Sequence, residues 1–136
     1  LAGLGDRLLD HETIDRVDYL FVNQSALGGL DMDPRDVATR GCEVIVLDGA
    51  RGSLVVASQP DADTFIPPVS VKAVDTTGCS DTYLGAYLVH RLGGADVSEA
   101  GAFASAAAAR AATGIGPRFG ATDAGTIEQF RSQLGC

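Results

Sequence analysis

A short stretch from Asp75 to Asp81 holds the residues best suited to chemistry, in the order Asp-Thr-Thr-Gly-Cys-Ser-Asp. A strand-like run at 69–74 precedes it, and large apolar side chains follow it at helical spacing: Tyr83, Leu84, Tyr87, Leu88 and Leu92. We therefore expect a strand, a loop and then a helix that begins close to Gly78. The first N–H groups of a helix lack acceptors inside it and the helix dipole adds positive charge, so this end suits a phosphate or an oxyanion.

Asp81 falls in the first turn of the expected helix. A carboxylate beside an anion site repels a bound phosphate, unless its task is to accept a proton from an attacking hydroxyl. That task is the work of a general base in phosphoryl transfer. The alternative is an ordinary helix, capped by a threonine, in which Asp81 merely complements the dipole.

Length and composition fit one soluble α/β domain spanning residues 1–136, with 46% hydrophobic residues and 17 glycines. The net charge of −8 disfavours nucleic acid and anionic membrane as partners. The three cysteines form no metal-binding or disulfide pattern, so we expect a reducing, cytoplasmic setting. A homodimer remains a hypothesis that the sequence does not decide.

The remaining elements are expected from periodicity and from caps. We expect a helical lead-in over residues 1–17, and Asp33-Pro34 predicts the start of a short helix. Strands are expected at 18–22, 43–48 and 53–57, the last two joined as a hairpin by Gly49 to Gly52. Residues 59–68 read as a connection, Asp96 and Glu99 as a capping box, and residues 127–134 as a closing helix.

The loop and its helix resemble the second signature of the ribokinase-like, phosphofructokinase-B-type (PfkB) sugar and nucleoside kinases. In that family the loop usually reads Asp-Thr-Thr-Gly-Ala-Gly-Asp, and here Asp75 to Asp81 is followed by Gly85-Ala86. The resemblance implies a ribokinase-like three-layer α/β/α fold with a largely parallel central sheet and a β-hairpin. It covers the chain from Asp18 onward and corresponds to the C-terminal, nucleotide-binding half of such a kinase.

The resemblance also implies roles for individual residues. Asp81 would be the catalytic base, and Gly78, Cys79 and Ser80 would form the anion hole. The nucleotide would contact five further positions: Asn23, Gly49, Gly52, Ser105 and Gly116. Asp75 and Thr77 would help to hold a monovalent cation such as K⁺. The implied activity is ATP-dependent and Mg²⁺-dependent phosphorylation of a sugar or nucleoside hydroxyl.

In the loop, Cys79 stands where the family has alanine, which is a small change, and two further departures have larger consequences. Ser80 stands where the family has glycine, so we expect its Cβ to strain or narrow the anion hole. Ala26 stands where an Asn-x-x-Glu motif beginning at Asn23 would have its glutamate, and this affects the metal-handling part of the mechanism. Neither change alters the expected base, Asp81.

Three functional hypotheses follow from this pattern. The first is an ATP-dependent carbohydrate kinase, or its nucleotide-binding half, which would be inactive without the acceptor-binding half. The second is a catalytically inactive nucleotide-binding or regulatory module that keeps the kinase fold. The third is an unrelated α/β domain with a chance match, which would bind no nucleotide.

Overall fold

The structure is a computed structural model that describes residues 11–29 and 33–135. The chain forms two compact units, which we consider separately. Unit 1 comprises the chain up to Asp48 together with Ser53–Phe65, and unit 2 comprises Gly49–Gly52 and the chain from Ile66 onward. Of the expected lead-in at 1–17, the described part holds α1 (His11–Ile14), and residues 1–10 lie outside the described ranges.

Unit 1 is built around a four-stranded sheet in the order β1-β2-β3-β4. The strands are β1 (Tyr19–Asn23), β2 (Glu43–Leu47), β3 (Ser53–Val56) and β4 (Thr64–Ile66), whose last residue falls in unit 2. β1 pairs with β2 in parallel and β2 pairs with β3 antiparallel, so the sheet is mixed and includes the expected hairpin. The 3-10 helix η2 (Gln24–Gly29) and α2 (Pro34–Thr39) connect β1 to β2.

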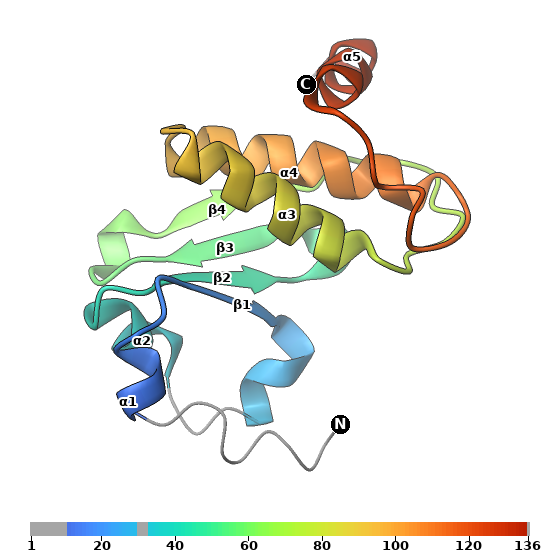
Figure 1. Ribbon diagram of the computed structural model, residues 1–136. Coiled ribbons are helices and arrows are strands. Elements are labelled where there is room, and N and C mark those ends of the chain that lie inside the picture. The colour runs from blue at the N-terminus through green and yellow to red at the C-terminus, as the bar shows by residue number, and fades with distance from the viewer. Residues whose placement is uncertain (1–10, 30–32, 136) are drawn as a thin grey trace. The chain divides into compact units, whose positions relative to one another are not determined.

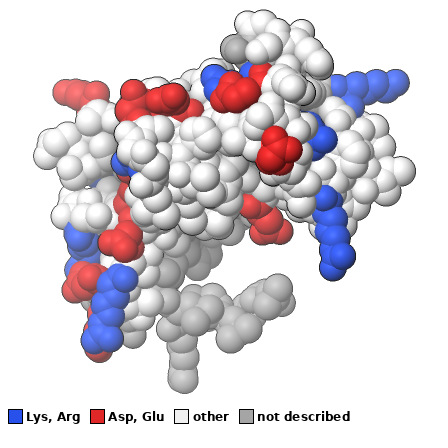
Figure 2. Space-filling model, turned by 45° about the horizontal axis from the view of Figure 1, so that its top comes forward, with Lys and Arg blue, Asp and Glu red and all other residues white. Residues whose placement is uncertain are grey.

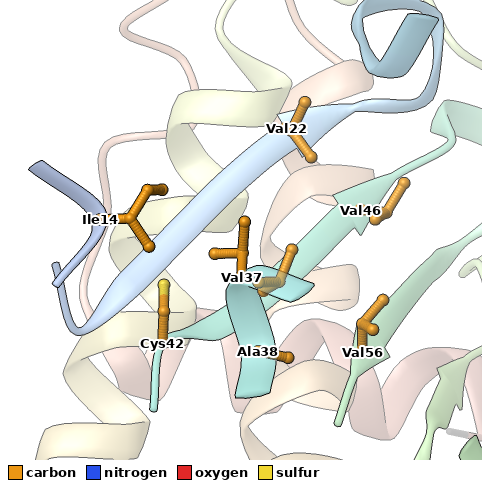
Figure 3. Close-up of a cluster of buried hydrophobic side chains, with 8 residues drawn as sticks. Ile14, Val22, Val37, Ala38, Cys42, Val46 and Val56 are labelled. Carbon is orange, nitrogen blue, oxygen red and sulfur yellow. The ribbon is translucent and has the colours of Figure 1, made fainter. Parts of the chain in front are cut away.

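The core of unit 1 lies on one face of this sheet (Figure 3). Val22, Val46 and Val56 point from the strands toward Ile14 of α1 and Val37 of α2. Val22 and Val46 are register partners, and their side chains therefore lie on the same face of the sheet. The run of β-branched residues Val44, Ile45 and Val46 favours a strand, and Ile45 lies on the face opposite to Val44 and Val46.

Unit 2 contains α3 (Cys79–Leu92), α4 (Val97–Ala112) and α5 (Ala124–Leu134), and α4 packs against both of the others (Figure 1). Small side chains dominate α4, which lets neighbouring segments approach its backbone closely. At Gly101, for example, a Cβ would overlap the side chain of Ile66 at 2.5 Å. A core of Phe103, Ala106, Ala107 and Ile127 joins α4 to α5. The 3-10 turn η3 (Gly49–Arg51) belongs to this unit as well.

The helix starts expected at Asp33 and Asp96 are confirmed by their caps, and the last helix has a similar cap at Asp123. Asp33, Asp96 and Asp123 each accept a hydrogen bond from a backbone N–H in the first turn of the helix that follows. Pro34 occupies the first turn of α2, where its missing N–H costs nothing. Within the described ranges, no helix is long and apolar enough to cross a membrane.

The expected strand at 69–74 is wrong. Its backbone N–H groups bond to α4 instead of to a neighbouring strand: Val69 donates to the Ser105 hydroxyl at 3.2 Å, and Val74 donates to the carbonyl of Ala112 at 2.7 Å. A strand does occur within the expected connection 59–68, as β4, after the 3-10 turn η4 (Pro60–Ala62). It spans three residues, too few for a period-two pattern to be recognised.

Candidate active site

Gly78 determines how the loop enters α3. Its φ is +80°, and it is the N-cap residue of the helix. A Cβ added here would lie 3.0 Å from both the Cα and the carbonyl oxygen of Pro117. Glycine is therefore required both by the backbone conformation and by the close approach of the 114–120 loop.

The first turn of α3 presents N–H groups that lack acceptors. The helix ladder begins with the N–H of Thr82, which donates to the carbonyl of Gly78 at 2.9 Å. Among the hydrogen bonds of the described residues, none uses the N–H of Ser80 or Asp81 as its donor. Cys79, expected in the anion hole, instead donates its N–H to Thr76 at 3.2 Å. The N–H groups of Ser80 and Asp81 are therefore the ones best placed to bind an anion.

The Asp81 side chain is exposed in this same turn. Its carboxylate has no described partner within hydrogen-bonding distance in residues 11–29 and 33–135. A carboxylate that is not already engaged can accept a proton from a hydroxyl placed beside it. The structure thus brings a potential base and two available N–H donors to the same end of α3.

The expected strain at Ser80 is wrong. Ser80 is the second residue of α3, and no described residue other than glycine has a positive φ. The turn that needs glycine is made one step earlier, at Gly78, so a Cβ at position 80 projects from ordinary helical backbone into solvent. Replacing glycine by serine therefore leaves the backbone of the loop unstrained.

The carboxylate of Asp75 joins the loop to the segment that follows α4. One oxygen accepts the N–H of Thr77 at 2.9 Å, and the other accepts the N–H of Gly116, also at 2.9 Å. Hydrogen bonds from the side chain and the N–H of Thr77, and then from Gly116, lower the pKa of Asp75 below its usual range. Asp75 is therefore ionised at neutral pH. Gly116, an expected nucleotide contact, supplies one of these donors from a turn with φ +85°.

This carboxylate provides the basis for testing the expected cation site. The Asp75 carboxylate has about four lone-pair sites, more than the hydrogen bonds it accepts from Thr77 and Gly116, so an anionic oxygen ligand is available to a hard monovalent cation. The Thr77 side chain lies on the exposed part of the same loop. Within the described ranges, no three His, Cys, Asp or Glu side chains gather as a metal site.

The thiol of Cys79 is half-buried in the loop. Burial, with a further contribution from the negative charge of Asp75, raises the pKa of Cys79 above its usual range. The thiol is therefore protonated at neutral pH and is a weak nucleophile. Cys79 acts here as a small apolar side chain, close in size to the alanine of the family pattern.

Gly49 is the first residue of the 3-10 turn η3 between β2 and β3, and Gly52 directly follows this turn; their φ values are +56° and +100°. No atom lies within 4 Å of a Cβ added to Gly49, whereas one added to Gly52 would collide with the carbonyl oxygen of Ile66. Gly52 is therefore required for close packing against the Ile66–Pro68 segment. Gly49 is more exposed, and is the more accessible of the two to a ligand.

Ser105, the expected adenine contact, has a structural role. Its side chain is buried, with 8% exposed. The hydroxyl donates to the carbonyl of Pro67 at 3.0 Å and accepts the N–H of Val69 at 3.2 Å. These two bonds fix the Pro67–Val69 segment against α4.

Asn23 ends β1 in unit 1, with an exposed side chain, and Ala26 follows in η2. Asn23 belongs to a different compact unit from the Asp75–Asp81 loop. The structure supports its position at the end of a strand, as the sequence predicted. Ala26 has no carboxylate, so it cannot take the part of the glutamate of the family motif.

Sequence reasoning missed the residues that hold the loop in place. Pro117 packs against Gly78, and the carbonyl of Ala112 accepts the N–H groups of Val74 and Asp75. Arg110 contacts Phe119 through a 3.2 Å hydrogen bond to its carbonyl and by lying 5.2 Å over its ring. The signal for these contacts was the Gly-Pro pair at 116–117, which marks a turn but does not reveal what the turn touches.

Comparison with known proteins identifies the family. The model of the pfkB family carbohydrate kinases matches residues 6–124. Ribokinase of Bacillus subtilis (strain 168) is 30% identical over 129 residues, which are 93% of this chain and 43% of that protein. Mouse ribokinase is 44% identical over 48 residues, 35% of this chain and 15% of that protein. This chain spans less than half the length of these relatives.

Solved structures show the same fold. Ribokinase of Thermotoga maritima superposes with a TM-score of 0.76 at 28% identity, over 93% of this chain and 46% of that one. A nucleoside kinase of Burkholderia thailandensis, in complex with ADP and inosine, gives a TM-score of 0.82 at 25% identity, over 98% of this chain and 44% of that one. An E. coli ribokinase-II-like protein in complex with ATP and Mg²⁺ gives a TM-score of 0.79 at 25% identity, over 90% of this chain and 42% of that one.

The chain therefore belongs to the pfkB family of carbohydrate kinases and has a ribokinase-like α/β fold. The family resemblance inferred from the loop sequence is confirmed, and so are the expected ribokinase-like α/β fold and its hairpin.

Proposed function

We propose that this chain is the nucleotide-binding half of a kinase that transfers the γ-phosphoryl group of ATP to a hydroxyl of a sugar or nucleoside. The observation that carries the proposal is the end of α3, where Asp81 lies beside two N–H groups without acceptors. Membership of the pfkB family and the nucleotide complexes of similar proteins support it.

In this proposal the residues of the chain divide the work. The Asp81 carboxylate accepts the proton of the attacking hydroxyl, and the N–H groups of Ser80 and Asp81 donate to the oxygens that gain charge. Gly78 holds these donors in place because its turn sets the start of the helix. Mg²⁺, when bound with ATP, would neutralise charge on the phosphates. A monovalent cation at Asp75 and Thr77 would further fix the loop.

The experiment compares Asp81→Asn with Asp61→Asn, a matched change at an exposed aspartate of η4. Both variants are assayed for nucleotide binding by calorimetry and for phosphoryl transfer with a coupled assay over sugars and nucleosides. We expect Asp81→Asn to keep nucleotide affinity and to lose about 10²–10⁴-fold in kcat, the usual contribution of a general base. Turnover of Asp81→Asn within tenfold of the parent would remove Asp81 from this role.

The assay needs the acceptor-binding half of the fold, because positioning of both substrates supplies much of the catalysis. For the 136-residue chain alone we expect weak binding of ATP or ADP and no phosphorylation. The second candidate, a nucleotide-binding module without turnover, is favoured by Ala26 in place of glutamate. Binding without turnover, even when the missing half is supplied, would select that candidate.

A further inference from the structure

Thr82 lies in the first turn of α3 and bonds back to the start of the helix. Its N–H and its hydroxyl both donate to the carbonyl oxygen of Gly78, each at 2.9 Å. The first bond belongs to the helix ladder, whereas the second is an additional bond from a side chain to the backbone. The N–H of the same peptide group, that of Cys79, donates to the carbonyl of Thr76 at 3.2 Å. Both ends of the 78–79 peptide group are therefore held.

The conformation of Gly78 explains why this peptide group needs an additional bond. Gly78 has φ +80° and ψ +1°, and glycine, almost alone among residues, can also adopt a similar φ with a ψ of roughly ±150–180°. Rotation of the 78–79 peptide group between these two regions would reverse its carbonyl and its N–H. A Cβ would restrict this rotation, but the close approach of Pro117 leaves no room for one at position 78. The freedom of the glycine must therefore be limited by a neighbouring group.

The orientation of this peptide group matters for an anion at the start of α3. The carbonyl of Gly78 accepts bonds from the next turn, so it points along the helix and away from the N–H groups of Ser80 and Asp81. The reversed group would turn the partial negative charge of its oxygen toward a bound anion. The net charge is −8, and the face shown in Figure 2 has acidic as well as basic side chains. Binding of an anion therefore depends on how these backbone groups are oriented.

The Thr82 side chain is itself held by the end of the 114–120 loop. A Cβ added to Gly120 would collide with the hydroxyl oxygen of Thr82, and it would lie 2.8 Å from the Cβ of Ala111. Gly120 is buried, so the loop backbone packs directly against the threonine. The side chain of Thr82 has little room to leave the rotamer in which its hydroxyl reaches Gly78.

We propose that Thr82 is a positioning residue for phosphoryl transfer. Its hydroxyl holds the 78–79 peptide group, so that the N–H groups of Ser80 and Asp81 stay directed at the transferring group. Thr82 does not touch the substrate but acts through Gly78, and Gly120 sets its position. The consequence for catalysis rests on the proposed function, whereas the restraint on the peptide group can be measured without a nucleotide.

Three variants of Thr82 separate its hydroxyl from its methyl group. Thr82→Ser keeps only the hydroxyl, Thr82→Val replaces the hydroxyl by a methyl group, and Thr82→Ala loses both groups. Positioning through the hydroxyl predicts that Thr82→Ser behaves like the parent, whereas packing against Gly120 predicts this of Thr82→Val. The matched control is Thr39→Val in unit 1, because the Thr39 hydroxyl also donates to a carbonyl one turn earlier, that of Asp36, at 2.7 Å.

The first measurement is the exchange of the Cys79 N–H with water, followed by NMR without ligand. We expect exchange to be about 3–10-fold faster in Thr82→Val and Thr82→Ala than in the parent and Thr82→Ser, the range for loss of one neutral hydrogen bond. Thr39→Val should leave this rate unchanged. The N–H of Ala106, in the buried middle of α4, reports global unfolding in every form. Equal rates in all Thr82 forms, or rates that follow the methyl group, would overturn the proposal.

The second measurement is ATP binding and turnover per folded molecule. Calorimetry with ATP-Mg²⁺, and a coupled kinase assay with the acceptor-binding half supplied, should give the same order of variants. We expect kcat to fall about 3–10-fold in Thr82→Val and Thr82→Ala with an unchanged KM for the acceptor, and Thr82→Ser to restore it. A residue that only stabilises the fold would leave these values unchanged.

The two measurements distinguish failure of this proposal from failure of the proposed function. If no form binds ATP, the parent included, the proposed function fails, and the order of the exchange rates alone confirms or overturns the restraint by Thr82. If all forms bind ATP and turn over equally, the positioning role is refuted and the proposed function stands.

Discussion

The Gly78 turn offers the sharpest test of how the loop is held, through the variant Gly78→Ala. Two penalties are expected. The left-handed backbone at φ +80° costs a residue with a Cβ about 1–2 kcal/mol. The new Cβ would also lie 3.0–3.1 Å from Pro117, and overpacking of this kind costs about 1–3 kcal/mol unless the neighbour moves. The sum is about 2–5 kcal/mol, a large share of the stability of a small domain.

Two matched glycines separate these penalties. Gly116→Ala carries the backbone penalty alone, because its φ is +85° and no atom lies within 4 Å of the added Cβ. Gly85→Ala carries neither penalty, since Gly85 is an exposed helical position, and should stabilise by about 0.5–1 kcal/mol. The difference between Gly78→Ala and Gly116→Ala then measures the contact with Pro117.

Free energies of unfolding come from urea titrations followed by circular dichroism. We expect Gly78→Ala to be less stable than Gly116→Ala by about 1–3 kcal/mol, with an unchanged slope against urea. Nucleotide affinity should fall in parallel, because either the 114–120 loop or the start of α3 must move. Equal stability of these two variants would show that Pro117 does not press on Gly78 and would refute the close approach.

Three further predictions concern other contacts. Ser105→Ala should cost about 1–3 kcal/mol in the same titrations, because the N–H of Val69 loses its acceptor, and should leave nucleotide affinity per folded molecule unchanged. The hydrogen bond from Arg35 lowers the pKa of Asp63 in the folded protein. The stability that this pair contributes should therefore be complete above the ordinary aspartate pKa and should be lost as the pH falls below about 4. In thermal melts, Asp63→Asn should lose less stability on acidification than the parent. Ser80→Gly should raise neither turnover nor phosphate affinity. It should lower stability by about 0.5–1 kcal/mol, since glycine in a helix is unfavourable. A clear gain in turnover would restore the idea that Ser80 strains the loop.

The sequence was sufficient for features that are encoded locally. The cap at Asp96 and the start of α3 at Gly78 depend on residues within a few positions of each other, so their patterns predicted the structure. The loop motif also predicted the family, because the spacing from Asp75 to Asp81 is long and specific. The roles assigned to Asp81 and the other site residues stay predictions until the variants are measured.

The error at residues 69–74 has its cause in partners distant in sequence. Residues 69–74 alternate as a strand does, but their N–H groups are taken by Ser105 and Ala112, more than thirty residues away. The hydroxyl of Ser105 also donates to the carbonyl of Pro67 in this segment, and the nucleotide contact expected at Ser105 stays a prediction. No local pattern reports where a backbone N–H finds its acceptor, so the strand expected at 69–74 is wrong because of an unseen contact between α4 and the preceding segment.

These contacts indicate why the loop can keep its geometry although two family positions have changed. Cys79 differs from the family residue at a position that tolerates a small side chain, and Ser80 differs at a position where the backbone is already helical. The restraints lie elsewhere: the Asp75 carboxylate accepts the N–H of Gly116, and Gly78 meets Pro117. Both connect the start of α3 to the turn after α4, so a ligand that moves that turn must also move the N–H donors beside Asp81. Cation binding at Asp75 and phosphate binding at α3 are therefore expected to be coupled, each strengthening the other through this turn.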